Sequence, residues 1–199
     1  MIVIGLTGSI AMGKSATAKQ FAARGVPVFD SDQVVHELYA KEGAAVPALM
    51  ELVPSAVIDG AVDRNRLSQA VREQPDLLKK IEAIVHPMVR DRQKIFLANA
   101  QRTGATVAVL DIPLLFETAR EQEVDRIAVV STTAEIQRER ALQRPGMTPE
   151  KLDFILSRQM ADAEKRARAD YVIDTSISIA DSQRQVDDIL LQLSRPSGS

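Results

Sequence analysis

The chain reads Gly8-Ser9-Ile10-Ala11-Met12-Gly13-Lys14-Ser15 near its amino terminus. This stretch fits G-x-x-x-x-G-K-[ST], the pattern of a loop whose backbone N–H groups cradle phosphates. Its neighbours are in the required order, because the apolar run Ile2–Leu6 predicts a buried strand before it and residues 16–23 predict a helix after it. The amino terminus of that helix adds partial positive charge. The segment therefore predicts a nucleotide-phosphate site.

Two side chains of this loop predict its chemistry. Lys14 can reach the β- and γ-phosphates of a nucleotide, and the Ser15 hydroxyl can bind Mg²⁺.

Composition excludes several classes of protein. The 199 residues carry a formal net charge of −2 and no cysteine. The charge balance argues against a nucleic-acid or anionic-membrane surface, and the lack of cysteine excludes disulfides and thiolate chemistry. No apolar run is long enough to span a bilayer, and no signal peptide precedes the first strand. We expect a soluble, cytoplasmic α/β domain with insertions.

Short apolar runs separated by helical patterns predict a parallel sheet flanked by helices. Five strands are expected, at residues 2–6, 26–29, 107–110, 127–130 and 171–173. Residues 33–101 contain no expected strand and indicate a helical insertion. Residues 138–168 are rich in arginine and are expected to be helical on both sides of Arg144-Pro145-Gly146. Residues 195–199 are expected to form a disordered tail.

Acidic residues follow two of the expected strands. Asp30-Ser31-Asp32 comes at the carboxyl end of the second strand, where ligands bind in parallel sheets. A carboxylate there can accept a proton from an attacking hydroxyl or assist a metal, or it can simply cap the helix that begins near Gln33. Asp111 ends another strand, either as a metal-associated carboxylate or as an ordinary strand end.

Basic residues give weaker signals. An arginine-rich segment can clamp a transferring phosphoryl group, although most of its arginines are expected to be solvated and paired with neighbours such as Glu139 and Asp162. We expect about two of six to contact a ligand: Arg138, Arg140, Arg144, Arg158, Arg166 and Arg168. His36 and His86 lie on helical patterns and have no metal-ligand partner at a useful spacing. Pro87 should kink or start a helix.

These residues together resemble the dephospho-coenzyme A kinase family. The matching segments cover nearly the whole chain in the family's order: residues 4–15, 28–32, Ile84-Val85-His86-Pro87, Asp111-Ile112-Pro113-Leu114-Leu115-Phe116-Glu117, residues 137–144, Ser157-Arg158-Gln159 and residues 169–174.

The resemblance implies ATP-dependent phosphorylation of the ribose 3′-hydroxyl of dephospho-CoA, the last step of coenzyme A synthesis, with Mg²⁺. It implies the nucleoside-monophosphate-kinase-like variant of the P-loop NTPase fold, with a five-stranded parallel sheet. The core would comprise residues 1–32, 102–137 and 169–199, the helical coenzyme-binding insertion residues 33–101, and the helical lid residues 138–168.

The resemblance also implies roles for individual residues. Asp32 would be the base for the 3′-hydroxyl, Lys14 the phosphate clamp and Ser15 a Mg²⁺ ligand, with Arg140 contacting phosphate beside the lid. ATP would be held by Arg140 and by the loop residues Gly8, Ser9, Ile10, Ala11, Met12, Gly13, Lys14, Ser15 and Ala16. Dephospho-CoA would be held by Thr7, Asp32, His86, Pro113 and Leu114.

The chain departs from the family's usual pattern at a few positions. Its loop carries Ser9, Ala11 and Met12 where the commoner version is richer in glycine. Ala11 is expected to need a negative φ, and Met12 is expected to stand over the nucleotide rather than touch phosphate. Ser31 replaces the more usual alanine, and Thr175-Ser176 stands where an asparagine near the adenine is expected.

Other functions compete with this interpretation. A kinase for another small hydroxyl compound or a nucleoside monophosphate would share the loop. A nucleotide-switch or regulatory ATPase would also share it, but a GTP switch needs an N-K-x-D signature that the chain lacks. A regulatory ATPase would not need a large helical insertion next to an exposed aspartate.

Overall fold

The computed structural model describes residues 1–194 and divides them into two compact units. The core unit comprises residues 1–29 and 100–194, and the helical unit comprises residues 30–99. The expected tail at residues 195–199 lies outside the described residues.

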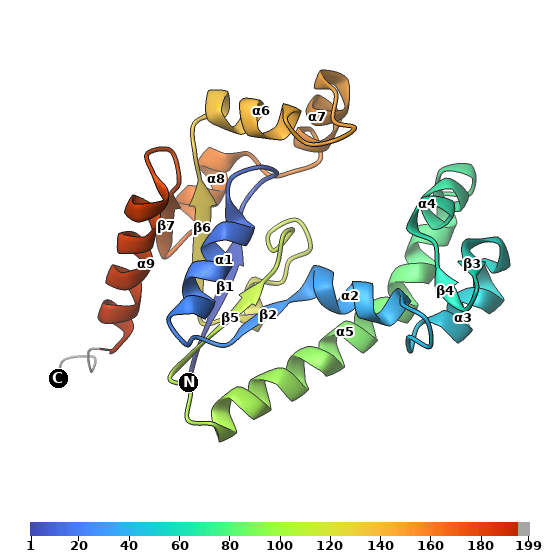
Figure 1. The fold of residues 1–199 in the computed structure, drawn as a ribbon, viewed down its shortest axis with the longest axis horizontal. Coiled ribbons are helices and arrows are strands. Elements are labelled where there is room, and N and C mark those ends of the chain that lie inside the picture. Colours follow the sequence, from blue (N-terminus) through green and yellow to red (C-terminus); the bar gives the residue numbers. More distant parts are fainter. Residues whose placement is uncertain (195–199) are drawn as a thin grey trace. The chain divides into compact units, whose positions relative to one another are not determined.

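A five-stranded parallel sheet forms the centre of the core unit (Figure 1). The spatial order is β2-β5-β1-β6-β7. The strands are β1 (Ile2–Thr7), β2 (Val28–Asp30), β5 (Val107–Asp111), β6 (Arg126–Ser131) and β7 (Tyr171–Asp174). All five expected strands are therefore confirmed. β5 is buried along its whole length, as a strand covered on both faces requires, whereas β2 and β7 at the two edges of the sheet are only partly buried.

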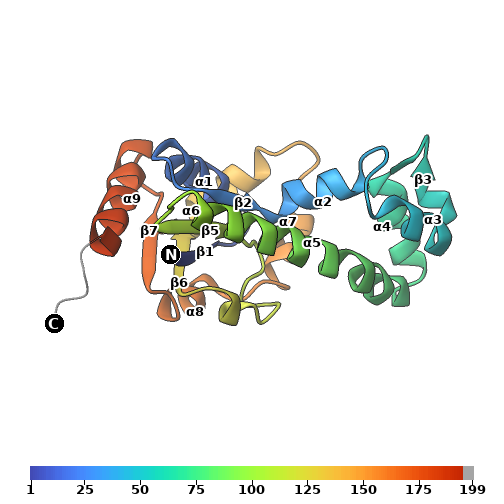
Figure 2. The same ribbon diagram turned by 90° about the horizontal axis from the view of Figure 1, so that it is seen from below.

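Helices cover both faces of this sheet. Figure 2 shows α1 (Lys14–Ala23) and α9 (Ile179–Ser194) on one face and α8 (Asp162–Ala167) on the other. Phe21 of α1 and Val186 of α9 are fully buried against strand residues such as Ile4. The helices α6 (Ala134–Leu142) and α7 (Pro149–Leu156) flank the Arg144-Pro145-Gly146 break, as expected. A short 3-10 helix, η2 (Glu121–Glu123), precedes β6.

The helical unit contains α2 (Ser31–Tyr39), α3 (Val46–Leu52), the 3-10 helix η1 (Pro54–Ala56), α4 (Arg64–Glu73) and most of α5 (Asp76–Arg102). It also contains the hairpin β3 (Val57–Ile58) and β4 (Ala61–Val62), so the expectation of no strand in this region is wrong. Asp59 and Gly60 both have positive φ, 49° and 79°, which is the conformation of a tight hairpin turn. Pro87 lies inside α5 and does not start a helix. Among residues 1–194, no helix is long and apolar enough to cross a membrane.

Candidate active site

The loop of residues 8–13 joins β1 to α1. Its first glycine is required by a close contact and its last by its backbone conformation. A Cβ at Gly8 would lie 2.7 Å from the Val130 carbonyl oxygen. Gly13 has a φ of 98° and directly precedes Lys14, the first residue of α1. Ser15 and Ala16 are exposed on the first turn of that helix. The loop therefore has the strand, turn and helix arrangement that a phosphate site needs.

The middle of the loop differs from expectation at two residues. Ala11 has a φ of 62°, so the expected negative φ is wrong. The left-handed conformation costs about 1–2 kcal/mol for a residue with a Cβ. Ala11 is buried and packs with Ala141 of α6 and Leu152 of α7, contacts that hold it in this conformation. Met12 is only 2% exposed, so its side chain lies inside the unit and does not stand over a nucleotide site as expected.

The loop lysine is paired with a strand carboxylate. The Lys14 ammonium donates a hydrogen bond to Asp111 Oδ1, and the Asp111 side chain is only 4% exposed. The pair forms because β5 lies beside β1, with Asp111 in register with Leu6. A cation and an anion thus meet at the carboxyl edge of the sheet, beside the phosphate loop, where a nucleotide and Mg²⁺ present both charges.

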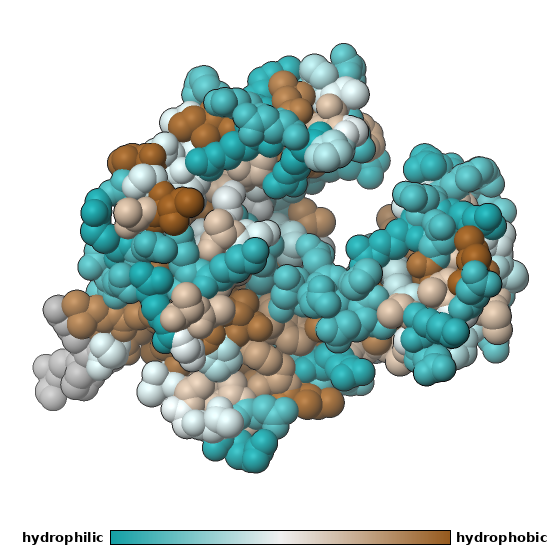
Figure 3. Space-filling view, in the orientation of Figure 1, coloured by the Kyte–Doolittle hydropathy of each residue, from teal (hydrophilic) through white to brown (hydrophobic). Residues whose placement is uncertain are grey.

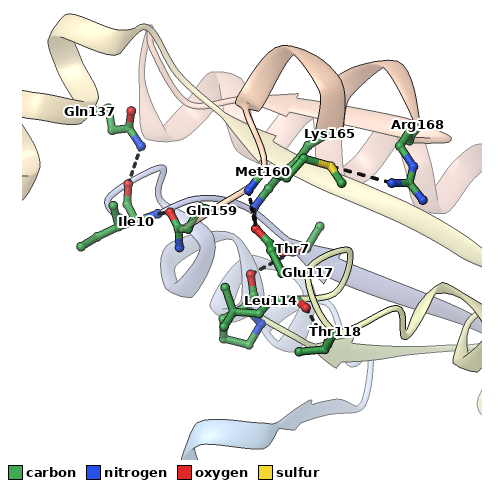
Figure 4. Close-up of polar contacts among 11 residues, drawn as sticks. Thr7, Ile10, Leu114, Glu117, Thr118, Gln137, Gln159, Met160, Lys165 and Arg168 are labelled. Carbon is green, nitrogen blue, oxygen red and sulfur yellow. Dashed lines mark hydrogen bonds and ion pairs between the residues drawn. The ribbon is translucent and has the colours of Figure 1, made fainter. Parts of the chain in front are cut away.

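Thr7 supports the segment that follows β5. Its side chain is fully buried, and its hydroxyl donates to the Pro113 carbonyl oxygen at 3.2 Å (Figure 4). Leu114 is 41% exposed in the same segment. In this structure the Thr7 side chain therefore holds the segment that contains Pro113 and is not itself exposed to solvent.

Arg140 is held by the residue that stands where asparagine was expected. Its guanidinium donates to Thr175 Oγ1 at 3.0 Å and to the Thr175 carbonyl oxygen at 2.8 Å. The Thr175 hydroxyl donates in turn to the Met12 carbonyl oxygen at 2.8 Å. These contacts connect α6, the end of β7 and the phosphate loop.

The other arginines of this region have different neighbours from those expected. Arg138 pairs with Asp153 at 3.0 Å, and Arg168 pairs with Glu121. Asp162 accepts a hydrogen bond from the Ser131 hydroxyl at 2.7 Å. The acidic partners of Arg138 and Arg168 are thus 15 and 47 residues away in the sequence and are not the nearby Glu139 and Asp162.

A cavity of about 430 Å³ adjoins the phosphate loop on the side of α9. Gly13, Arg140 and Thr175 contribute to its wall. Ile177 and Ile179 also line it and are 76% and 70% exposed. Figure 3 shows apolar patches over this loop between β7 and α9. A cavity with one apolar wall and an arginine fits a flat aromatic base.

A buried ion pair behind the loop was missed by the sequence reasoning. Lys165 is fully buried, and its ammonium lies 2.8 Å from Glu117 Oε1 (Figure 4). The same oxygen accepts the Met160 N–H at 2.9 Å. Burial raises the pKa of the Glu117 carboxyl, but the bonds from Lys165 and Met160 and the charge of Lys165 lower it more, so this pKa lies below its ordinary value. The carboxylate is therefore the form that the fold stabilises.

This pKa shift predicts a pH-dependent stability. A depressed folded-state pKa contributes stability above the ordinary pKa of glutamate, and that contribution is lost as the pH falls through the folded-state value. We expect Glu117→Gln to lower the free energy of unfolding by about 3 kcal/mol near neutral pH, because it leaves Lys165 buried without its counter-charge. Urea denaturation should show the gap from wild type narrowing below about pH 4.5. A gap that is independent of pH would contradict this account.

The acidic residues of the second strand end belong to the helical unit. Asp30 is the N-cap of α2, and its side chain accepts the Gln33 N–H at 3.0 Å, which confirms the capping interpretation for this residue. Asp32 lies in the first turn of α2 and is exposed, two residues after β2 ends. Its side chain is thus available to a ligand. His86 is exposed on α5.

The donor set fits a magnesium ion held chiefly by a nucleotide. Among residues 1–194, no three histidine or acidic side chains are grouped so that they could hold a metal ion. Mg²⁺ in phosphoryl-transfer sites uses one or two protein oxygens together with phosphate oxygens and water. The exposed Ser15 hydroxyl and the Asp111 carboxylate are ligands of that kind.

Comparisons with known proteins identify the family of this chain. A family model described as dephospho-CoA kinase matches residues 2–181. A dephospho-CoA kinase of Rhodopseudomonas palustris is 55% identical over 190 residues, which cover 96% of this chain and 94% of that protein. A solved structure of TT1252 from Thermus thermophilus aligns with a TM-score of 0.82 at 33% identity and 98% coverage of both chains. A dephospho-CoA kinase from Campylobacter jejuni has the same fold, with a TM-score of 0.67 at 20% identity and 98% coverage of both chains. The chain belongs to the dephospho-CoA kinase family.

Proposed function

We propose that this enzyme transfers the γ-phosphoryl group of ATP to the ribose 3′-hydroxyl of dephospho-CoA, which gives coenzyme A and ADP. The observation that carries the proposal is the phosphate loop with its Lys14–Asp111 pair, in a chain of this family. Family membership supports the substrate, and the loop supports the nucleotide and the type of reaction.

The reaction assigns a task to each group. The ribose 3′-oxygen attacks the γ-phosphorus, the bond from that phosphorus to the oxygen shared with the β-phosphate breaks, and ADP leaves with that oxygen. The hydroxyl proton passes to the Asp32 carboxylate. Backbone N–H groups of the loop and the Lys14 ammonium stabilise charge on the transferring group. Ser15 and Asp111 would hold Mg²⁺, which when bound would supply positive charge against the phosphates.

The Lys14–Asp111 pair keeps both groups in place before ATP binds. A buried carboxylate is costly without a partner, and the ammonium supplies one. In the complex with the nucleotide, the Lys14 ammonium would contact the phosphates as a second anion, and the Asp111 carboxylate would assist the metal ion. The pair therefore prepares the site for a nucleotide–metal complex.

The remaining parts of the chain receive roles from the same proposal. The segment of residues 33–101, which contains His86, binds the coenzyme, and the segment of residues 138–168 acts as the lid. Pro113 and Leu114 contact dephospho-CoA, and the hydrogen bond from the Thr7 hydroxyl to the Pro113 carbonyl oxygen holds this segment in place. Arg140 contacts phosphate, and the cavity beside Thr175 takes the adenine. We place the enzyme in the cytoplasm, where ATP is abundant.

The lid role predicts ordering on nucleotide binding. A bound phosphate would give the arginine side chains of this segment additional charge-assisted hydrogen bonds, so residues 138–160 should become more protected. Hydrogen exchange measured with and without a non-hydrolysable ATP analogue tests this. Equal exchange rates in the two states would remove the lid role.

Acceptor specificity tests the proposed function. ADP release is measured with ATP and Mg²⁺ in the presence of dephospho-CoA, nucleoside monophosphates, shikimate or no acceptor. Dephospho-CoA should give turnover far above the others. Faster turnover with another acceptor would show that dephospho-CoA is not the preferred substrate. ADP release that is as fast without acceptor as with dephospho-CoA would indicate an ATPase.

A further inference from the structure

Two glutamines hold consecutive peptide groups of the phosphate loop. The Ile10 N–H donates to Gln159 Oε1 at 3.1 Å, and the Ile10 carbonyl oxygen accepts Gln137 Nε2 at 2.9 Å (Figure 4). The Gln159 side chain thus acts as an acceptor and the Gln137 side chain as a donor toward the same residue, Ile10. Gln137 lies on α6 and is only 7% exposed, and Gln159 follows α7.

The peptide that Gln137 holds directly precedes the strained residue of the loop. The Ile10 carbonyl belongs to the peptide bond to Ala11, whose φ is 62°. Ala11 packs on Ala141 and Leu152, and Ile10 packs against the same cluster. A conformation this costly persists only when its surroundings hold it. Here α6, α7 and the two glutamines supply those surroundings.

The position of Gln159 is fixed by contacts of the residue that follows it. The next residue, Met160, donates its N–H to Glu117 at 2.9 Å, and Glu117 is fixed by the buried Lys165 at 2.8 Å. The Glu117–Lys165 pair therefore fixes Met160, and through Met160 it fixes the neighbouring Gln159, which accepts the Ile10 N–H. These side chains can influence ATP binding without contacting ATP, because they fix the backbone of the phosphate loop.

We propose that Gln137 and Gln159 are positioning residues that hold the phosphate loop in the conformation that binds the β-phosphate, with the Glu117–Lys165 pair fixing Gln159. The proposal rests on the proposed function only for the identity of the nucleotide. The loop contacts the phosphates through backbone N–H groups, so its fit depends on peptide orientation and not on a side chain that can adjust. In a glycine-rich loop, flexible backbone can adopt this shape alone; in Ser9-Ile10-Ala11-Met12 the flanking glutamines and helices impose it.

Nucleotide affinity measured by calorimetry tests the proposal. Gln137→Met and Gln159→Met remove one hydrogen bond each at nearly constant volume, and each should weaken ADP binding about 5-fold. AMP, which has no β-phosphate, should bind with unchanged affinity. Gln143→Met is the matched control, because Gln143 is exposed at the end of α6 and its side-chain amide donates to Glu139 at 3.5 Å and not to the phosphate loop. A merely structural role would lower the melting temperature without changing the ratio of ADP to AMP affinity.

A charge-matched pair of variants separates hydrogen bonding from electrostatics. Gln159→Glu keeps an acceptor for the Ile10 N–H, whereas Gln137→Glu replaces a donor by an acceptor facing a carbonyl. Both add the same charge next to Ile10, so Gln137→Glu should weaken ADP binding more. The proposal is overturned if ADP affinity stays within about two-fold of wild type in both methionine variants, or if wild-type protein binds no ADP. Because ADP binding needs no acceptor, failure of dephospho-CoA turnover alone would count against the proposed function and not against this inference.

Discussion

Asp32→Asn is expected to slow the phosphoryl-transfer step by about 10²–10⁴, the usual contribution of a positioned acid or base. Asparagine keeps the shape and hydrogen-bonding capacity of the side chain but cannot accept the proton of the 3′-hydroxyl. The lower end of the range is expected, because proton removal is late in a loose transition state. Asp32 is exposed in the first turn of α2, so the substitution should not disturb packing. Single-turnover rates and ATP affinity are the measurements, and ATP affinity should barely change.

Asp30→Asn provides the matched comparison. Asp30 caps α2 through the Gln33 N–H, and asparagine caps helices nearly as well, so stability should be retained. Any loss of rate should be small and should be partly restored by excess Mg²⁺. The roles would be assigned to the wrong carboxylate if Asp32→Asn reacts normally while Asp30→Asn is inactive even at high Mg²⁺.

Lys14→Ala is expected to lose about 10²–10³ in turnover, the typical cost of removing one electrostatic contact from a transition state. It should also lower the free energy of unfolding, because it leaves the buried Asp111 carboxylate without its partner. The ammonium stabilises charge that spreads over the β- and γ-phosphates during transfer. Turnover at saturating ATP is the measurement, with circular dichroism as the check on folding. Near-wild-type turnover in the folded variant would contradict the phosphate-loop assignment.

The sheet could be predicted from sequence because its strands are continuous apolar runs. Val107–Leu110 has no polar residue, which suits a strand buried on both faces and separates it from the amphipathic helices around it. The hairpin of β3 and β4 was missed because each strand has only two residues. Its signal was nevertheless present, since Asp59-Gly60 between short apolar pairs is a tight-turn sequence.

The candidate site was only partly predictable. The loop, Lys14 and Asp111 are visible as motifs, but their pairing depends on the order of strands in the sheet, which the runs themselves do not specify. The Glu117–Lys165 pair joins residues far apart in sequence and has no local pattern. The positive φ of Ala11 could not be read from its residue type, because alanine disfavours that conformation and tertiary packing imposes it.

The product of the reaction tests the central claim most directly. The enzyme is incubated with ATP, Mg²⁺ and dephospho-CoA, and the purified product is analysed by mass spectrometry and by phosphorus–proton coupling in NMR. The account predicts one added phosphoryl group, with the new phosphorus coupled to the ribose 3′-proton, and one ADP formed for each product molecule. A phosphoryl group on another hydroxyl, or ADP formed without phosphorylated dephospho-CoA, would contradict it.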